Sequence, residues 1–183
     1  MRSLFARDPL ADPEALIRRV YAYAAYRLGD GPDAEDVTSE VFERALRYRN
    51  SYDRSKGKPV TWLLGIASRC ASAALAARAE GWAPIEDAPD SASFEDDSVR
   101  RLTLSAALAQ LSDRDQELIA LRFGADLTAA QIARIQDAKT NAVEVALHRA
   151  LDRLRSILER DTANETTAPR TLTASARGAP ESA

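Results

Sequence analysis

Residues 127–154 read LTAAQIARIQDAKTNAVEVALHRALDRL, and this stretch decides the fold of the C-terminal half. Thr128 followed by Gln131 forms a capping-box pattern at the start of a short helix. A turn at residues 136–138 separates this helix from a longer amphipathic one that starts near Lys139. The layout predicts a helix-turn-helix, although two packed helices of any bundle can share it.

The second helix of such a pair carries the side chains that can reach base edges in a major groove. Its spacing turns an apolar stripe toward the core, at Val143, Leu147, Ala150, Leu151 and Leu154. The residues expected to point outward are Thr140, Asn141, Glu144, Val145 and His148, and all of these except Val145 are expected to read bases. The residues expected at phosphates are Lys139, Arg149 and Arg153. His148 has no histidine or cysteine partner nearby, so a phosphate contact or a solvated side chain is favoured over a metal site.

The rest of the chain also has helical periodicity. A helix is predicted from Asp12-Pro13 to Gly29, a second after Gly31-Pro32, and a third over residues 60–79. The stretch NSYDRSKGKP at residues 50–59 is typical of a basic surface loop. Helices resume near Val99, and the chain holds only seven glycines. The sequence therefore predicts an all-α fold.

Charge and composition divide the chain. The net charge is -3, yet residues 81–98 hold six acidic and no basic residues, and the blocks on either side are slightly basic. This predicts two small helical domains, residues 12–80 and 99–160, joined by an acidic flexible linker at 81–98. Residues 161–183 are poor in large apolar side chains and are predicted to be a disordered tail.

Several classes of protein are not expected. Cys70 is the single cysteine, which excludes an internal disulfide, and its apolar setting predicts a buried side chain. No apolar run approaching the roughly 20 residues of a membrane span, and no signal peptide, is apparent. A cytoplasmic protein without a membrane partner is expected. No nucleophile–base pair, phosphate-binding glycine loop or metal-ligand cluster stands out, so we expect no enzyme, cofactor, metal or small-molecule substrate.

Two blocks taken together resemble a known family. LSDRDQELIALRFGADLTAAQIARI followed by AVEVALHRALDRLR resembles region 4 of the extracytoplasmic-function (ECF) group of RNA polymerase sigma factors. DAEDVTSEVFERAL, the basic loop and TWLLGIASRCA resemble region 2 of the same group. The resemblance covers residues 12–158. It implies an alternative sigma factor that binds core RNA polymerase and promoter DNA, and it implies an anti-sigma partner.

The resemblance also assigns roles to residues. It implies a polymerase-binding surface on the second helix, at Glu35, Asp36, Glu40 and Arg44, where the residues alone would favour a solvated face with intrahelical charge pairs. It implies that the loop 52–61 captures a flipped base of the minus-ten element, with phosphate contacts from Arg54, Lys56 and Lys58. Gly57 would permit close backbone approach, and Trp62 would pack in the core.

The chain departs from this family at expected DNA contacts. Arg69 stands where an asparagine is usual, and Ala73, Ala76 and Ala77 stand where an aspartate and arginines are common. Of the basic run only Arg78 is present, and in the recognition helix Glu144 and Ala146 replace frequent lysine and arginine. Fewer cations predict weaker, less salt-dependent binding. The alternatives are a stand-alone helix-turn-helix regulator and a polymerase-binding protein with weakened DNA recognition.

Overall fold

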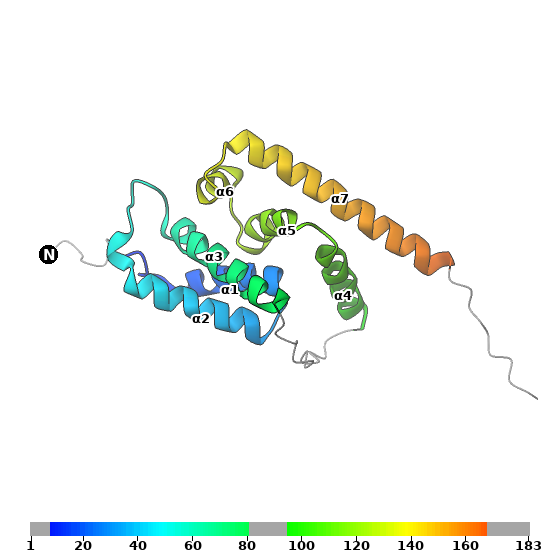
Figure 1. Ribbon diagram of the computed structural model, residues 1–183, viewed down its shortest axis with the longest axis horizontal. Coiled ribbons are helices and arrows are strands. Elements are labelled where there is room, and N and C mark those ends of the chain that lie inside the picture. The colour runs from blue at the N-terminus through cyan, green and yellow to red at the C-terminus, as the bar shows by residue number, and fades with distance from the viewer. Residues whose placement is uncertain (1–7, 81–94, 168–183) are drawn as a thin grey trace, which may run out of the picture.

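The computed structural model describes residues 8–80 and 95–167, and every regular element in these two ranges is a helix (Figure 1). The elements are α1 (Pro13–Leu28), α2 (Pro32–Arg47), the short turn η2 (Arg49–Ser51), α3 (Pro59–Ala79), α4 (Glu95–Ala109), α5 (Asp113–Ile119), η3 (Ala120–Gly124), α6 (Ala129–Ile135) and α7 (Thr140–Thr167). The prediction of an all-α protein is therefore confirmed.

The helices of the N-terminal half begin where local chemistry favours a start. The Asp12 side chain accepts a hydrogen bond from the Ala15 amide, and α1, α2 and α3 each have proline at the first position. Proline suits that position because its missing N–H would have no partner inside the helix. Gly29 ends α1 with a φ of 92°, which side chains other than glycine rarely adopt. The predicted starts of α1 and α2 are confirmed.

Helix α3 corrects one expectation. It is 21 residues long and apolar enough, by length and composition, to cross a membrane. This corrects the expectation that the chain has no apolar run approaching 20 residues. In the fold, α3 packs against α1, α2 and α6, and it buries Leu63, Leu64, Ile66 and Cys70. Its apolar side chains thus supply the centre of the core. Burial also raises the pKa of the Cys70 thiol.

In the C-terminal half α5 begins at a side-chain cap, and two helix ends differ from expectation. Ser112 accepts a hydrogen bond from the Asp115 amide at the start of α5. Helix α4 starts at Glu95, before the expected Val99, and α7 continues to Thr167, so the first residues of the predicted tail are helical. Residues 81–94 of the predicted linker and 168–183 of the predicted tail lie outside the described residues.

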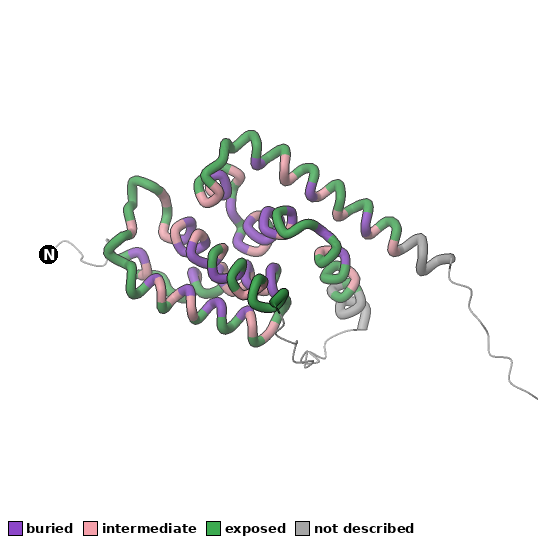
Figure 2. Tube along the Cα trace, in the orientation of Figure 1, coloured by how far each residue is buried: buried purple, intermediate pink, exposed green. Residues whose placement is uncertain are grey.

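One hydrophobic core runs through both halves. Buried side chains of α1, α2 and α3 form a single cluster with Leu118, Leu121, Leu127, Ile132 and Val143 from the C-terminal half. Figure 2 shows buried positions along the helices of both halves. A smaller cluster joins α4, α5 and α7 through Ala107, Leu111, Ile119, Ala150 and Ile157. The two halves, predicted as domains with a flexible connection, therefore pack on one another in this structure. The predicted domain boundaries stay a prediction.

Candidate nucleic-acid interface

Helices α6 and α7 form a helix-turn-helix with a rigid entry and turn. The Thr128 side chain accepts from the Gln131 amide at 3.3 Å, and the Gln131 side chain accepts from the Thr128 amide at 2.9 Å, which completes the expected capping box. In the turn, Asp137 adopts a φ of 50° and the Ala138 amide donates to the Ala133 carbonyl at 2.8 Å. The pair is rigid enough to present a recognition helix.

The first two turns of α7 project away from the core. Val143 is buried, whereas all the side chains that we predicted to contact DNA at this end are exposed: Lys139, Thr140, Asn141, Glu144, Val145, His148 and Arg149. The His148 ring lies 3.5 Å from the Asp152 carboxylate, one turn farther along the helix. The structure thus leaves this face open to a groove, while the base contacts themselves stay a prediction.

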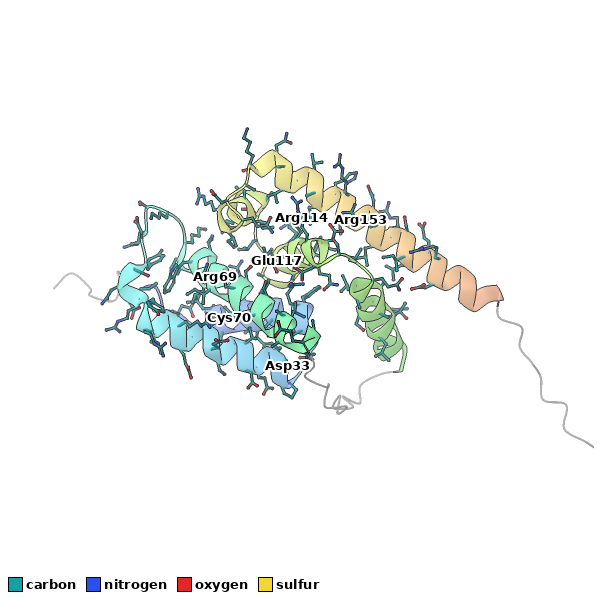
Figure 3. The ribbon with its side chains drawn as sticks, in the orientation of Figure 1. Asp33, Arg69, Cys70, Arg114, Glu117 and Arg153 are labelled. Carbon is teal, nitrogen blue, oxygen red and sulfur yellow. The ribbon has the colours of Figure 1, made fainter. Side chains whose placement is uncertain are left out.

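Arg153 has a structural role that the sequence did not suggest. Its guanidinium donates two hydrogen bonds to the Asp115 carboxylate, at 2.8 and 2.7 Å, and so fastens α7 to the first turn of α5 (Figure 3). The Asp115 side chain is 7% exposed and that of Arg153 is 51% exposed. We expected Arg153 to contact phosphate, but its charge is largely committed to this pair.

This pair predicts how stability depends on pH. The hydrogen bonds from Arg153 hold the pKa of the Asp115 carboxyl below its ordinary value, although burial opposes them. A lowered folded-state pKa stabilises the fold above the unfolded value of about 3.9, and this stabilisation is lost as the pH falls through the folded value. Asp115→Asn should lower the free energy of unfolding at pH 7 by about 1 kcal/mol, discounted because Arg153 is half exposed.

Urea unfolding followed by circular dichroism from pH 7 to pH 3 checks this. The difference in the free energy of unfolding between wild type and Asp115→Asn should shrink below about pH 4. Asp137→Asn is the control, because it makes the same change at an exposed carboxylate, and asparagine tolerates the positive φ of that turn. If this difference in the free energy of unfolding stays constant down to pH 3, the pair with Arg153 does not stabilise the ionised Asp115 carboxylate.

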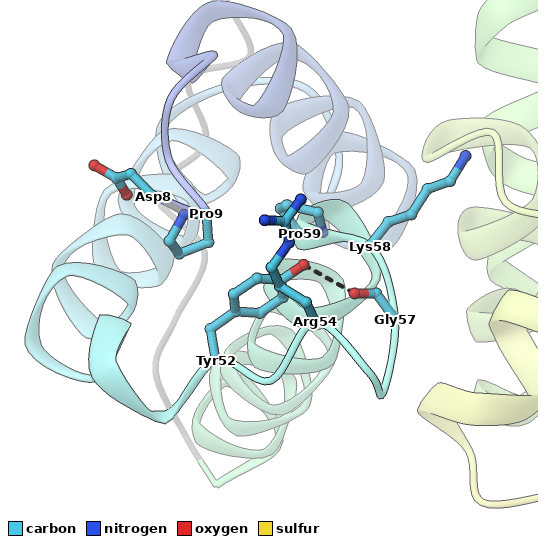
Figure 4. A pocket seen from close by; sticks show the side chains of 7 residues that line it. All are labelled: Asp8, Pro9, Tyr52, Arg54, Gly57, Lys58 and Pro59. Carbon is cyan, nitrogen blue, oxygen red and sulfur yellow. Dashed lines mark hydrogen bonds between the residues drawn. The ribbon is translucent and has the colours of Figure 1, made fainter. Parts of the chain in front are cut away.

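The basic loop between η2 and α3 borders a hollow. The centre of the Tyr52 ring lies 5.5 Å from that of the Trp62 ring. The Tyr52 hydroxyl donates to the Gly57 carbonyl at 2.9 Å (Figure 4). Gly57 has a φ of 156°. The hollow, about 240 Å³, is lined by Asp8, Pro9, Tyr52, Arg54, Gly57, Lys58 and Pro59. Trp62 packs half-buried against the core, as expected, so the aromatic wall belongs to Tyr52, to which we had given no role.

The other predicted DNA contacts of this half differ in their availability. Lys56, Lys58 and Arg69 are exposed, and Arg54 lines the hollow. Arg78 is engaged: it donates to the Leu28 carbonyl at 3.1 Å and forms an ion pair with Asp33, which ties the end of α3 to the α1–α2 connection. Ala73, Ala76 and Ala77 are all exposed, so the three positions where an aspartate and arginines were expected carry no charged side chain.

The predicted polymerase-binding residues lie on α2. Glu35 and Asp36 are exposed, whereas Glu40 and Arg44 are partly buried and form an ion pair with each other. The intrahelical pair that the residues alone suggested is therefore present. Within the described ranges, His, Cys, Asp and Glu side chains form no cluster that could hold a metal ion.

The two halves each match a family model. Residues 14–80 match Sigma-70 region 2, and residues 107–156 match Sigma-70 region 4. The chain belongs to the sigma-70 family. This sigma factor is 34% identical over 151 residues to the ECF RNA polymerase sigma factor SigD of Mycobacterium tuberculosis, a match that covers 74% of this chain and 70% of that protein. Within the family, it belongs to the ECF group.

Two further relatives extend the comparison. The chain is 30% identical over 152 residues to the ECF RNA polymerase sigma factor BldN of Streptomyces coelicolor, covering 78% of this chain but only 57% of that protein. A similar fold occurs in the sigma factor RpoE of Bartonella quintana, solved with the anti-sigma factor NepR. That similarity has a TM-score of 0.63 at 18% identity and covers 80% of this chain and 93% of the other.

Proposed function

We propose that this chain is an alternative sigma factor that binds core RNA polymerase and directs promoter-specific transcription initiation. The observation that carries the proposal is the exposed start of α7, presented by a rigid helix-turn-helix in a chain that also has the region 2 segment. A recognition helix without docking surfaces would suffice for a simple regulator. The second segment, with its acidic helix face and its hollow, is what a polymerase subunit needs.

Each surface has a task in this proposal. Residues 12–80 dock on the polymerase through α2, and the loop 52–61 captures a minus-ten base beside Tyr52. A planar base can stack on an aromatic ring, and the nearby cations neutralise phosphates. Residues 99–160 bind the minus-thirty-five element as duplex, and residues 81–98 and 161–183 serve as linker and tail. The predicted contacts of α7 with bases and phosphates belong to this proposal.

The partners follow from the same proposal. Core RNA polymerase and promoter DNA are the two binding partners, and an anti-sigma factor is the regulator. Its support is the Bartonella protein, which was solved in a complex with an anti-sigma factor, NepR. The site of action is the cytoplasm. We assign the chain no catalytic activity, cofactor or metal, because the family consists of initiation factors that work by binding.

One observation favours a second candidate, a polymerase-binding protein with weakened DNA recognition. The exposed face of α3 carries three alanines where an aspartate and arginines were expected, and Arg78 is held by Asp33. Each missing cation removes a counterion-release contribution to DNA binding. This candidate shares polymerase binding with the first and differs in promoter-directed initiation.

In vitro transcription with core RNA polymerase on a genomic fragment library, with and without the protein, tests the proposal. We expect new start sites that share a pair of spaced upstream elements. The double variant Glu35→Lys and Asp36→Lys should lose core binding about tenfold or more, because it reverses two exposed charges on the docking face. The single variant Glu35→Lys is compared with Glu14→Lys, the matched control, which reverses one exposed charge on α1.

The outcomes separate the candidates. Core binding without new start sites favours the second candidate. Neither core binding nor start sites would contradict both and leave a stand-alone regulator. Equal losses of core binding in the α2 variant and in the Glu14→Lys control would show that α2 is not the docking face.

A further inference from the structure

The hollow beside the basic loop is not built by that loop alone. Two of its lining residues, Asp8 and Pro9, belong to the segment before α1, and the others belong to the loop and to the start of α3. Figure 4 shows Asp8 and Pro9 on one side of the hollow and Lys58 on the other. One wall of the candidate base site therefore comes from a part of the chain to which the sequence assigned no role.

Residues 8–11, which we call the N-terminal turn, are held in a fixed shape. The Asp8 carboxylate accepts a hydrogen bond from the Leu10 amide at 2.9 Å, and the Asp8 carbonyl accepts one from the Ala11 amide at 3.4 Å. The Leu10 side chain packs against the hydrophobic core, and Pro9 is buried. The pyrrolidine ring also fixes its own φ. Pro9 is thus in place before any ligand arrives, which lowers the entropic cost of binding.

The wall that the loop contributes is also fixed. The Tyr52 hydroxyl donates to the Gly57 carbonyl at 2.9 Å, and the centre of its ring lies 5.5 Å from that of the Trp62 ring. The volume between the walls, about 240 Å³, is smaller than the roughly 300–1,000 Å³ of pockets for drug-sized ligands. The hollow therefore suits one small ring system, such as a single base.

The charges at the hollow orient a nucleotide. Lys58 is exposed on one side, and the exposed Asp8 carboxylate lies on the other (Figure 4). Phosphates are attracted by the lysine and repelled by the carboxylate, so the backbone of a bound strand passes on the Lys58 side. A base that enters from that side points toward Pro9.

We propose that the N-terminal turn is a wall of the base-binding hollow, and that Pro9 packs against the base of an unpaired nucleotide held beside Tyr52. The name of that nucleotide, a base of the minus-ten element, rests on the proposed function. The contact with Pro9 is apolar and does not involve the phosphates. Its loss should therefore weaken the binding of bases and leave the binding of the strand's backbone unchanged.

A double-mutant cycle between the protein and the strand tests this in the full chain. One probe is a pool of single-stranded DNA dodecamers of random sequence, which offers all four bases. The other is an abasic dodecamer, which has the same phosphates and no bases. Fluorescence anisotropy at fixed salt gives the affinity for each probe, and the ratio of the two affinities is the base preference.

We expect the wild type to prefer the pool that carries bases. Pro9→Ala should reduce this preference about threefold, because it removes two methylene groups from the wall, and Tyr52→Ala should reduce it about tenfold. Affinity for the abasic strand should stay the same in both variants, which shows that each still folds. Pro13→Ala is the matched control: it makes the same change at an exposed proline outside the hollow and should alter neither affinity.

The outcomes also separate this inference from the proposed function. If Pro9→Ala weakens binding of both probes equally, the N-terminal turn only supports the fold, and the inference is overturned. A wild type without base preference, or a preference that Tyr52→Ala leaves intact, overturns it as well. Transcription on the fragment library decides the proposed function separately. Base preference without start sites would leave the hollow as a site for unpaired nucleotides in a protein that is not an initiation factor.

Discussion

Leu63→Ala is expected to lower the free energy of unfolding by about 3 kcal/mol, the largest stability effect that we predict. Leu63 lies on α3 in the centre of the shared core and has no exposed surface. The substitution removes buried methyl groups and leaves a cavity, because close-packed neighbours relax only in part. Urea unfolding at neutral pH, followed by circular dichroism, measures the change.

Leu46→Ala provides the control for this prediction. Leu46 is on α2 and is 57% exposed, so the same chemical change there should cost less than about 0.5 kcal/mol. Because the core is continuous through both halves, Leu63→Ala should also move the unfolding of the whole chain as one transition. Two separate transitions, with only the first shifted, would contradict a shared core.

The fold could be predicted well where its signals are local. The Asp12-Pro13 start, the proline at the start of α2 and the capping box of Thr128 and Gln131 each satisfy backbone groups within a few residues. Such signals are present in the sequence itself. The end of α7 was harder, because helix ends fray gradually and residues 161–167 carry no stop signal of glycine or proline.

The contact between the halves could not be predicted from the sequence. Arg27 and Glu117 are 90 residues apart, and each alone is typical of an exposed helix face. Gly124 ends η3, as a glycine often ends a helix, but its second constraint comes from α1, which lies within 3 Å of the position a Cβ would take. A pattern of burial along one helix shows that a face is covered and does not show which element covers it.

The sequence predicted which side chains of the candidate site are exposed, but it did not predict which of its charged side chains form ion pairs within the protein. The 3.6-residue period placed the start of α7 outward correctly. It could not show that Arg153 pairs with Asp115 or that Arg78 pairs with Asp33, because a cation binds whichever carboxylate the fold brings near. Two residues that were expected to contact DNA are thus engaged within the protein.

Glu144→Ala is expected to have two opposite effects on DNA binding. Glu144 is exposed near the start of α7, where a carboxylate repels phosphates but can accept a hydrogen bond from cytosine N4. Removing it should strengthen binding to unrelated duplex DNA. It should also reduce discrimination at one base pair of the minus-thirty-five element by about tenfold, since a base contact contributes about 1 kcal/mol or more.

Competition binding with the promoter duplex, its single-base variants and an unrelated duplex separates the two effects at fixed salt. Glu159→Ala is the charge-matched control, because it removes one carboxylate from the same helix about 22 Å away, at about 1.5 Å per residue. Both variants should bind unrelated duplex DNA slightly more tightly because each loses a negative charge. The gain should be larger for Glu144→Ala. Only Glu144→Ala should relax base preference, and relaxation in neither variant would mean that Glu144 faces the backbone rather than a base.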